Sequence, residues 1–346
     1  MKTLVVGGTG LISTAIVKEL VERGDEVILF HRHPAGIRGT VTVTGDRSVE
    51  ADLLRLLSVH HAFDCVIDMV GYEPEPVALC VRLFKGKTRQ YLFCSTVDVY
   101  AKPAARYPIL ENEPKMMEPA FSYAYNKVLC ERLLEEAHER GDFAVTIIRP
   151  AATHQDDSWP IPLLGNGRGV VERIRLGLPV LVPGDGTALW ASAHRDDIGP
   201  VFAHAAGNPH TYGKSYHVTG KEWLTWNEYY ATVARVLGAP PLQVIAMPTH
   251  LMHGIIPEAM LWTRYNFMLH NIFDNTAAER DLGYVQHIGW EQLVRRMMKH
   301  HGYLDNEGRP LPQTETKEPD SAMELYGKVV EGLDKAGQWL SAFLMK

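Results

Sequence analysis

The most constraining feature of this sequence is a glycine-rich stretch, GGTGLIS (7–13), between a short apolar run and a helical repeat. The run TLVVG (3–7) is apolar and β-branched, and apolar residues then recur at helical spacing until Gly24. A strand that turns tightly into a helix presents free backbone N–H groups and the positive helix end at one point, which suits a pyrophosphate. The same turn can also be purely structural.

Individual positions in this stretch have distinct expected roles. Gly7 permits the tight turn, and Gly10 lets the backbone approach phosphates closely. The place of a third glycine, which would allow the helix to pack tightly on the strand, holds Ser13. The residues expected to contact a dinucleotide here are Gly7, Thr9, Gly10, Leu11 and Ile12.

The strand–helix pattern repeats along the first 150 residues. Helical periodicity predicts helices over 48–58 and 122–140. The strands predicted after the first one cover 26–30, 41–46, 63–71, 90–96 and 143–150. Strands that alternate with helices in this way predict an α/β fold with a six-stranded, doubly wound parallel sheet of the Rossmann type.

The composition of the sequence changes after Pro150, where glycine and proline become frequent. We expect a smaller C-terminal α/β substrate domain, with a strand at 214–220, a helix at 225–238 and a helical stretch at 250–272. The predicted domains are therefore 1–150 for dinucleotide binding and 151–305 mainly for substrate binding, with some segments returning to the first domain. Residues 306–346 read as a linker and a C-terminal amphipathic helix.

Charge and composition exclude several classes of partner. A formal net charge of −6 gives no positive field for a polyphosphate, so DNA is not expected and RNA is not favoured. The four cysteines lie in apolar stretches without C-x-x-C spacing, which predicts buried thiols of a reducing compartment. The 16 histidines lack a third ligand at workable spacing, so no metal is expected. No apolar run reaches the about 18 residues of a membrane span, which favours a soluble cytoplasmic protein.

A tyrosine and a lysine one helical turn apart form the second motif, Tyr123-Ala-Tyr-Asn-Lys127. Both side chains then lie on the same helix face. A phenol ordinarily titrates near about 10, and a nearby ammonium lowers the pKa of a tyrosine, so Tyr123 could exchange a proton with a substrate alcohol. The alternative is a packed tyrosine and a solvated lysine that share a helix by chance.

The third motif is the end of the predicted strand 90–96, QYLFCST. The carboxyl ends of strands in doubly wound sheets face the ligand crevice, so the Thr96 hydroxyl is placed to hydrogen-bond a substrate oxygen. Taken alone, Thr96 is simply a strand end.

In this order and spacing, the three motifs resemble the extended short-chain dehydrogenase/reductase superfamily, specifically its NAD-dependent epimerase/dehydratase branch. The segment Ser95-Thr96-Val97-Asp98-Val99-Tyr100 resembles that family's Ser-Ser/Thr-x-x-Val-Tyr, and Arg149-Pro150 resembles its strand-end Arg-Pro. The resemblance covers roughly residues 1–303. Around Gly45-Asp46-Arg47 and Gly71 it points to an atypical subgroup that includes chloroplast stem-loop-binding proteins and bacterial members.

The resemblance implies roles for the motif residues. Tyr123 would remove the proton of a substrate alcohol, Thr96 would steady the oxygen, and Lys127 would lower the pKa of Tyr123 and hold the nicotinamide ribose. Asp98 matches an acidic residue of sugar dehydratases that handles a proton during loss of water. Its alternative role is to cap the turn into 101–105 or to bond backbone N–H groups. The further cofactor contacts implied are Asp46, Arg47, Gly71, Lys127 and Pro150.

The end of the second strand bears on which nicotinamide cofactor is bound. An acidic residue there binds the ribose hydroxyls of NAD, whereas a basic residue accommodates the 2′-phosphate of NADP. This strand ends Leu29-Phe30-His31-Arg32-His33, without a carboxylate. The guanidinium of Arg32 suits a phosphate, and His31 lies beside it, so the cofactor is NAD(P) with NADP favoured. Both residues could instead face solvent.

The predicted function is that of an NAD(P)-dependent epimerase or dehydratase that acts on a sugar or nucleotide sugar. The alternatives are a plain NADP-dependent reductase or dehydrogenase of a small carbonyl or polyol, and a non-catalytic member that binds nucleotide or RNA. The Tyr-Gly-Pro that usually follows Arg-Pro is replaced by AATHQDD, so the substrate loop cannot be carried over. There, His154 reads as a surface-loop histidine or as a residue that lines the site. No membrane partner is expected, and a homodimer is compatible with the sequence.

Overall fold

The computed structural model describes residues 1–34 and 36–312, together with 324, 326–328, 330–332, 334, 335 and 338. Contacts divide the chain into two units. The first comprises Met1–Gln155, Ala191–Trp223 and Ile272–Gly289, and the second comprises Asp156–Trp190, Leu224–Asn271 and Trp290–Lys346. The predicted domain limits at 150 and 305 stay predictions. Most of the predicted linker and helix over 306–346 lies outside the described residues.

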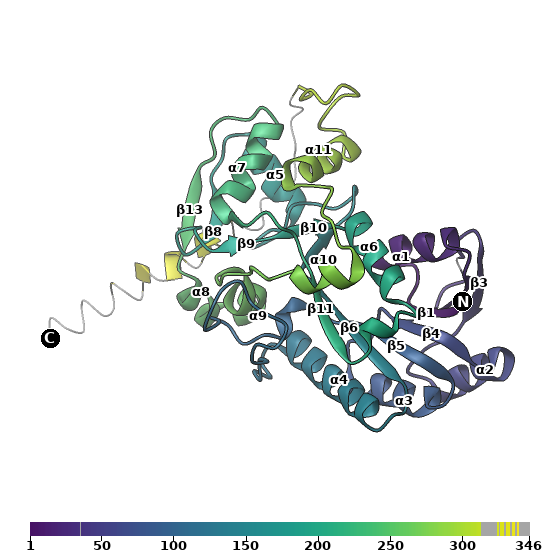
Figure 1. Ribbon diagram of the computed structural model, residues 1–346. Coiled ribbons are helices and arrows are strands. Elements are labelled where there is room, and N and C mark those ends of the chain that lie inside the picture. Colours follow the sequence, from purple (N-terminus) through teal and green to yellow (C-terminus); the bar gives the residue numbers. More distant parts are fainter. Residues whose placement is uncertain are drawn as a thin grey trace, which may run out of the picture. The chain divides into compact units, whose positions relative to one another are not determined.

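A seven-stranded parallel sheet forms the centre of the first unit, with the strand order β11-β6-β5-β4-β1-β2-β3 (Figure 1). The chain order reverses between β1 and β4, and the carboxyl ends of strands at such a point form the ligand crevice of doubly wound folds. The predicted α/β, Rossmann-type fold is therefore confirmed. The strands are β1 Lys2–Val6, β2 Glu26–His31, β3 Thr40–Thr44, β4 Phe63–Asp68, β5 Thr88–Cys94, β6 Ala144–Pro150 and β11 Lys214–Val218.

The strand β11 corrects the sequence prediction. The segment 214–220 was expected in the second domain, but its strand pairs in parallel with β6, with Tyr216 opposite Ile148. The sheet therefore has seven strands rather than six. The reason lies in the crossover, because a parallel neighbour needs a long connection and the intervening chain provides one through helix α6 (Arg195–Ala205).

Helices cover both faces of this sheet (Figure 1). One face packs on α1 (Leu11–Glu22), α6 and α10 (Thr276–Leu282), and the other packs on α2 (Glu50–His60), α3 (Pro74–Phe84) and α4 (Ser122–Glu139). Alternate strand residues enter the two clusters because strand side chains alternate between faces. Cys65 and Cys94 belong to the first cluster, and Cys80 and Cys130 belong to the second. All four cysteines are free and buried, so the predicted buried thiols are confirmed.

The second unit is mainly helical and contains a buried aromatic group. The Trp226 indole donates to the Phe267 carbonyl at 2.7 Å, and Tyr229 stacks on Trp290 with ring centroids 3.9 Å apart. The predicted helical stretch 250–272 is interrupted, because Pro257 begins a new helix. The elements are α5 Gly167–Arg175, β8 Val180–Pro183, β9 Leu189–Trp190, β12 Leu224–Thr225, α7 Trp226–Val236, β13 Val244–Met247, α8 Thr249–Ile255, α9 Pro257–Trp262, a π-helical turn Thr263–Phe267 and α11 Trp290–His300.

Candidate active site

The glycine turn lies where β1 passes into α1. Gly7 has a φ of +82°, and a Cβ added there would lie 2.5 Å from a Val70 methyl carbon, so the turn requires glycine. Ser13, in the place of the third glycine, accepts from the Gly10 N–H at 2.7 Å and donates to the Gly7 carbonyl at 2.8 Å. The serine side chain therefore stabilises the turn by bonding to the backbone at both of its ends.

This turn leaves an open approach to the start of α1. Thr9 and Gly10 are exposed, and Leu11 and Ile12 are half-buried in the first turn of the helix. The first N–H groups of a helix have no carbonyl partner within it and carry the positive end of the helix dipole. The turn therefore retains the features of a phosphate site, although the Gly10 N–H is already bonded to Ser13.

Arg32 and Asp46 lie near each other beyond the ends of β2 and β3. Hydrogen bonds from the Ser48 side chain and backbone, at 2.6 and 2.8 Å, lower the pKa of Asp46, and the charges of Arg32 and Arg47 lower it further. Arg32 is exposed, whereas His31 is buried at the end of β2. This corner offers one accessible cation and one carboxylate.

Two residues expected at the cofactor are engaged in packing instead. The Arg47 guanidinium is buried, contacts Asp68 at 2.7 Å and also donates to the Cys80 sulfur at 3.3 Å. A Cβ added to Gly71 would lie 2.5 Å from the Phe93 ring, so glycine is needed there for close packing. These contacts explain both residues without a ligand, and a cofactor role for either stays a prediction.

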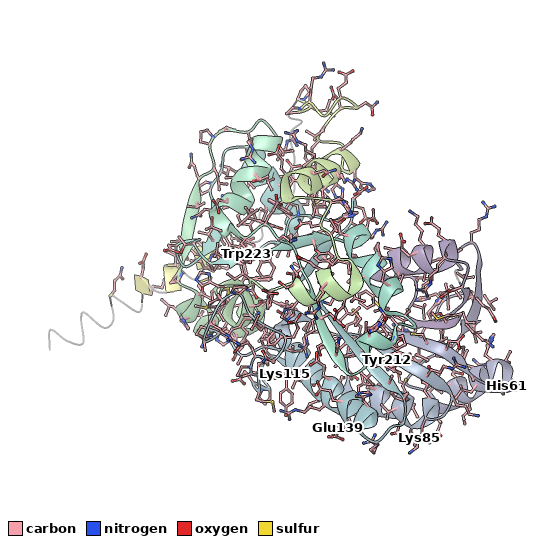
Figure 2. The ribbon with its side chains drawn as sticks, in the orientation of Figure 1. His61, Lys85, Lys115, Glu139, Tyr212 and Trp223 are labelled. Atoms are coloured by element: carbon pink, nitrogen blue, oxygen red, sulfur yellow. The ribbon has the colours of Figure 1, made fainter. Side chains whose placement is uncertain are left out.

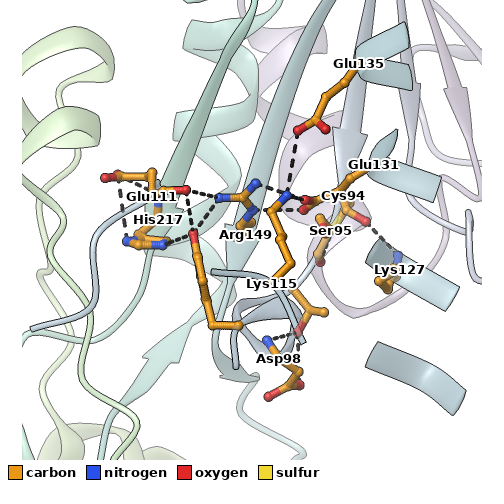
Figure 3. Close-up of polar contacts among 12 residues, drawn as sticks. Cys94, Ser95, Asp98, Glu111, Lys115, Lys127, Glu131, Glu135, Arg149 and His217 are labelled. Atoms are coloured by element: carbon orange, nitrogen blue, oxygen red, sulfur yellow. Dashed lines mark hydrogen bonds and ion pairs between the residues drawn. The ribbon is translucent and has the colours of Figure 1, made fainter. Parts of the chain in front are cut away.

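The Thr96 hydroxyl contacts several polar groups just past β5, among them Asp98, which is labelled in Figure 3. Thr96 caps the short helix η1 (Val97–Val99), because its Oγ1 accepts from the Asp98 N–H at 3.2 Å. The same hydroxyl donates to Asp98 Oδ2 at 3.0 Å. Thr96 and Asp98 are both buried. The cap of η1 is therefore Thr96, and the alternative role of Asp98, as a cap of the turn into 101–105, stays a prediction.

Tyr123 joins this cluster from the first turn of α4. Burial disfavours the charged phenolate and raises the pKa of Tyr123, and the nearby Asp98 carboxylate raises it further. A side-chain hydrogen bond with Thr96 acts in the opposite direction. Tyr123 is half-buried, so its ring is part of the accessible surface of the cluster.

Lys127 lies one turn further along α4 with a different set of contacts. Its Nζ donates to the Cys94 carbonyl at 2.7 Å and lies 4.7 Å from the Tyr72 ring centroid and 4.8 Å from that of Phe93. Burial lowers the pKa of Lys127. The ammonium was expected to lower the pKa of Tyr123. The pKa of Tyr123 is instead raised, because burial and Asp98 dominate.

Sequence reasoning missed two residues beside these groups. Tyr72 follows Gly71, and its ring centroid lies 6.4 Å from that of Tyr123. Lys102, in the chain beyond η1, lies 3.5 Å from Asp98 Oδ1 through its Nζ. The sequence held one signal for Lys102, its position four residues after Asp98, but in a segment without helical periodicity that spacing predicts no contact. We refer to Thr96, Asp98, Lys102 and Tyr123 as the Thr96 cluster.

A second polar cluster lies nearby and is fully paired (Figure 3). Arg149 binds Glu131 through two hydrogen bonds of 2.8 and 2.9 Å, and Lys115 also contacts Glu131. Burial alone would raise the pKa of Glu131, but these cations lower it to about 2. Tyr100 accepts from Arg149 and lies 2.7 Å from His217 Nε2. We refer to Lys115, Tyr100, Glu131, Arg149 and His217 as the Glu131 cluster.

The segment that replaces the usual Tyr-Gly-Pro forms a short strand and buries His154. Pro150 is buried at the end of β6, and the chain continues into the short strand β7 (Ala152–His154), which pairs in parallel with β10 (Ser192–His194). His154 is 3% exposed, so the surface-loop reading is wrong. Burial, together with the adjacent His194, lowers the pKa of His154 to about 4.

The described part of the chain offers neither a metal-binding group nor a membrane-spanning helix. Among those residues, no group of three or more histidine, cysteine, aspartate or glutamate side chains could hold a metal ion. No helix within the same residues is both long enough and apolar enough to cross a membrane.

A family model matches more than half of this chain. The model of the NAD dependent epimerase/dehydratase family matches residues 3–218, which include the glycine turn, the Thr96 cluster and strand β11.

Individual relatives are distant. A 2′-dehydrokanamycin reductase of Streptomyces kanamyceticus is 25% identical over 242 residues, 69% of this chain and 68% of that protein. The chloroplast stem-loop binding protein of 41 kDa b of Arabidopsis thaliana is 24% identical over 261 residues, 70% of this chain and 65% of that protein. The chain thus spans about two thirds of the length of these relatives.

Solved structures share the fold. A UDP-glucose 4-epimerase of Thermotoga maritima with UDP-glucose superimposes with a TM-score of 0.67 at 19% identity, over 87% of this chain and 99% of that one. A dTDP-glucose 4,6-dehydratase of Bacillus anthracis in complex with NAD gives a TM-score of 0.68 at 14% identity, over 88% of this chain and 98% of that one.

Proposed function

We propose that this chain, which belongs to the NAD-dependent epimerase/dehydratase family, moves a hydride between a nicotinamide and a secondary alcohol or ketone of a sugar or nucleotide sugar. The observation that carries the proposal is the Thr96 hydroxyl, which contacts both Asp98 and Tyr123 at the carboxyl end of β5. The glycine turn lies at the same edge of the sheet, because all seven strands are parallel. A dinucleotide and a proton-transfer group therefore share one crevice edge.

The residues of the turn fit a dinucleotide. Glycine at position 7 and the exposed start of α1 suit a pyrophosphate, and the Arg32–Asp46 corner suits an adenosine end. A nicotinamide supplies hydride-transfer chemistry when it is bound. The exposed guanidinium of Arg32 supports a preference for NADP, since it offers a planar fork of donors to a 2′-phosphate.

The protein's own residues handle the proton. Tyr123 gives a proton to, or takes one from, the substrate oxygen, and Thr96 holds the Tyr123 hydroxyl in place. Lys127 donates a hydrogen bond to the Cys94 carbonyl at the end of β5, and its ammonium lies beside the Tyr72 ring. Asp98 places a carboxylate beside these hydroxyls, which suits chemistry that moves a second proton.

One observation favours plain reduction as a second candidate. At neutral pH the Tyr123 side chain is a phenol, as a tyrosine ordinarily is and as burial favours, so it holds a proton that it can give to a carbonyl oxygen. A relative at 25% identity bears the name of a reductase, 2′-dehydrokanamycin reductase. Reduction of a sugar ketone needs this proton and a hydride from a reduced nicotinamide, whereas epimerisation or dehydration also needs Tyr123 or Asp98 to accept a proton.

A relative with a nucleic-acid-binding name favours the non-catalytic alternative, but the net charge of this chain argues against it. One relative is a stem-loop binding protein, yet this chain has a formal net charge of −6, which disfavours binding to a polyphosphate. Binding of a structured RNA would show a steep loss of affinity with salt.

The test combines cofactor binding with turnover. Purified protein is titrated with the oxidised and reduced forms of NAD and NADP. Single-turnover nicotinamide absorbance is then followed with UDP-glucose and dTDP-glucose against the oxidised cofactor, and with sugar ketones against the reduced cofactor. We expect saturable dinucleotide binding and a change in nicotinamide redox state with at least one probe. Dinucleotide binding without any redox change, together with salt-sensitive binding of an RNA stem-loop, would contradict the enzyme and support the binding module.

A further inference from the structure

Lys102 is a buried lysine that neither motif reasoning nor the proposed mechanism uses. Its side chain is 3% exposed, although it lies in an irregular segment between η1 and α4. Lysines are almost never fully buried unless they are paired. A charge held in this position therefore needs a partner that compensates its desolvation.

The partner of Lys102 is Asp98. Their charged atoms lie 3.5 Å apart, and the Lys102 Nζ also lies 5.8 Å from the Phe273 ring centroid. Burial lowers the pKa of Lys102, and the Asp98 carboxylate raises it again. Each charge is buried, so removal of either one takes away compensation that the other receives.

The direction of the hydrogen bonds in this cluster depends on the charge of Asp98. Thr96 has a single hydroxyl proton and gives it to Asp98 Oδ2. The Thr96 oxygen also accepts from the Asp98 N–H at 3.2 Å, and the same hydroxyl contacts the Tyr123 side chain. A carboxylate at Asp98 thus fixes the orientation of the hydroxyl that lies beside Tyr123.

We propose that Lys102 is a positioning residue for the catalytic tyrosine: it holds the Asp98 carboxylate against Thr96 and offsets its charge at Tyr123. This inference rests on the proposed function and extends it. Without Lys102, the full negative charge of Asp98 acts on Tyr123, and the phenolate that accepts the alcohol proton forms at higher pH. The other titratable groups that face Tyr123 are Cys94 on β5, Tyr72 after β4 and Lys127 on α4, and none of them is altered.

The experiment is a double-mutant cycle of Lys102→Met and Asp98→Asn, read from the pH dependence of alcohol oxidation. The rising limb of that profile reports Tyr123 and lies well above the pH at which a carboxylate becomes protonated. Lys102→Met should move this limb up by about one pH unit, about tenfold in rate at a fixed pH on the limb, and Asp98→Asn should move it down. In the double variant, the loss of Lys102 should have little further effect, since its target is gone.

Two controls separate this role from a general loss of a lysine–aspartate pair. The exposed Lys85 pairs with Asp142 at 2.7 Å, beside the end of α4 that Glu139 marks in Figure 2. Lys85→Met should leave the profile unchanged. Lys102→Arg keeps a cation and should return the limb toward that of the wild type.

The outcomes distinguish the inference from the function on which it rests. The role of Lys102 would be overturned if Lys102→Met left the rising limb of the pH profile in place. It would also be overturned if Lys102→Met moved that limb equally in the wild-type and Asp98→Asn backgrounds. In both cases the proposed hydride transfer would be unaffected. Wild-type protein that transfers no hydride would overturn the proposed function and with it this role. A coupling between the two positions measured by urea unfolding would then show the ion pair to be purely structural.

Discussion

Helix α4 contributes Tyr123 to the Thr96 cluster and Glu131 to the Glu131 cluster. The two clusters differ in how their buried charges are paired with opposite charges. The Glu131 cluster pairs one carboxylate with a bidentate arginine and a lysine, and its hydroxyl and imidazole groups are bonded to each other. The Thr96 cluster holds one carboxylate against a hydroxyl and a single lysine at 3.5 Å, and it ends in a half-buried phenol. Two turns of the same helix separate Tyr123 from Glu131.

The difference indicates which cluster stabilises the fold and which one serves chemistry. A buried carboxylate with an ion partner on each oxygen has no reason to exchange a proton, and the pKa of Glu131 is lowered to about 2 accordingly. A buried carboxylate beside a tyrosine with a raised pKa is an arrangement that proton transfer can use.

The largest expected effect is on turnover. Tyr123→Phe should reduce hydride transfer by about 10²–10⁴-fold, because the hydroxyl that exchanges the proton is removed, and it should leave dinucleotide affinity within a few-fold. Steady-state kinetics and cofactor titration measure the two effects. Tyr125→Phe, on the same helix, is the matched control and should change neither. Rates of Tyr123→Phe within about tenfold of wild type would remove Tyr123 from the mechanism.

The next effect is on stability. Glu131→Gln should lower the free energy of unfolding by about 3–5 kcal/mol, because it leaves the buried Arg149 without its counter-charge. Glu135→Gln, which breaks a more exposed contact with Lys115 at 3.7 Å, should cost about 1 kcal/mol or less. Urea unfolding of both variants gives the comparison. Equal losses would mean that the Glu131 cluster is not the structural one.

Acid should weaken the first unit through its buried histidines. Burial, with the charge of Arg149, lowers the pKa of His217 to about 3, so the folded chain keeps this ring neutral. The unfolded chain binds a proton near about pH 6.5, so this contribution is complete above that pH and is lost as the pH falls toward 3. Between pH 6.5 and 5 the loss is about 2 kcal/mol. His217→Gln should flatten the slope of stability against pH, and an unchanged slope would refute the assignment.

The smallest expected effect is on cofactor choice. Arg32→Ala should weaken NADP binding by about tenfold and leave NAD binding nearly unchanged, because in the proposed site the guanidinium would contact only the 2′-phosphate. Arg38→Ala, another exposed arginine of the same region, is the control. If NAD and NADP affinities fall together, Arg32 does not read the phosphate.

Sequence patterns over short stretches predicted the strands and helices whose formation depends on nearby residues. Strands β1 to β6 and helix α4 follow from apolar runs and helical spacing, and the glycine turn follows from the conformational demands on Gly7. Strand β11 was assigned to the wrong domain, because its pairing with β6 is a long-range contact that its own residues do not encode. The raised pKa of Tyr123 and the burial of Lys102 were missed for a similar reason, since both depend on tertiary packing.

The central claim is that the Thr96 hydroxyl organises the reacting groups, and single-turnover hydride transfer in Thr96→Val tests it most directly. Valine keeps the shape of threonine but removes the hydroxyl that contacts Asp98 and Tyr123. We predict a fall of about 10²-fold or more in the rate of nicotinamide redox change, with cofactor affinity retained and activity largely restored in Thr96→Ser. A Thr96→Val protein that transfers hydride at the wild-type rate would contradict the account.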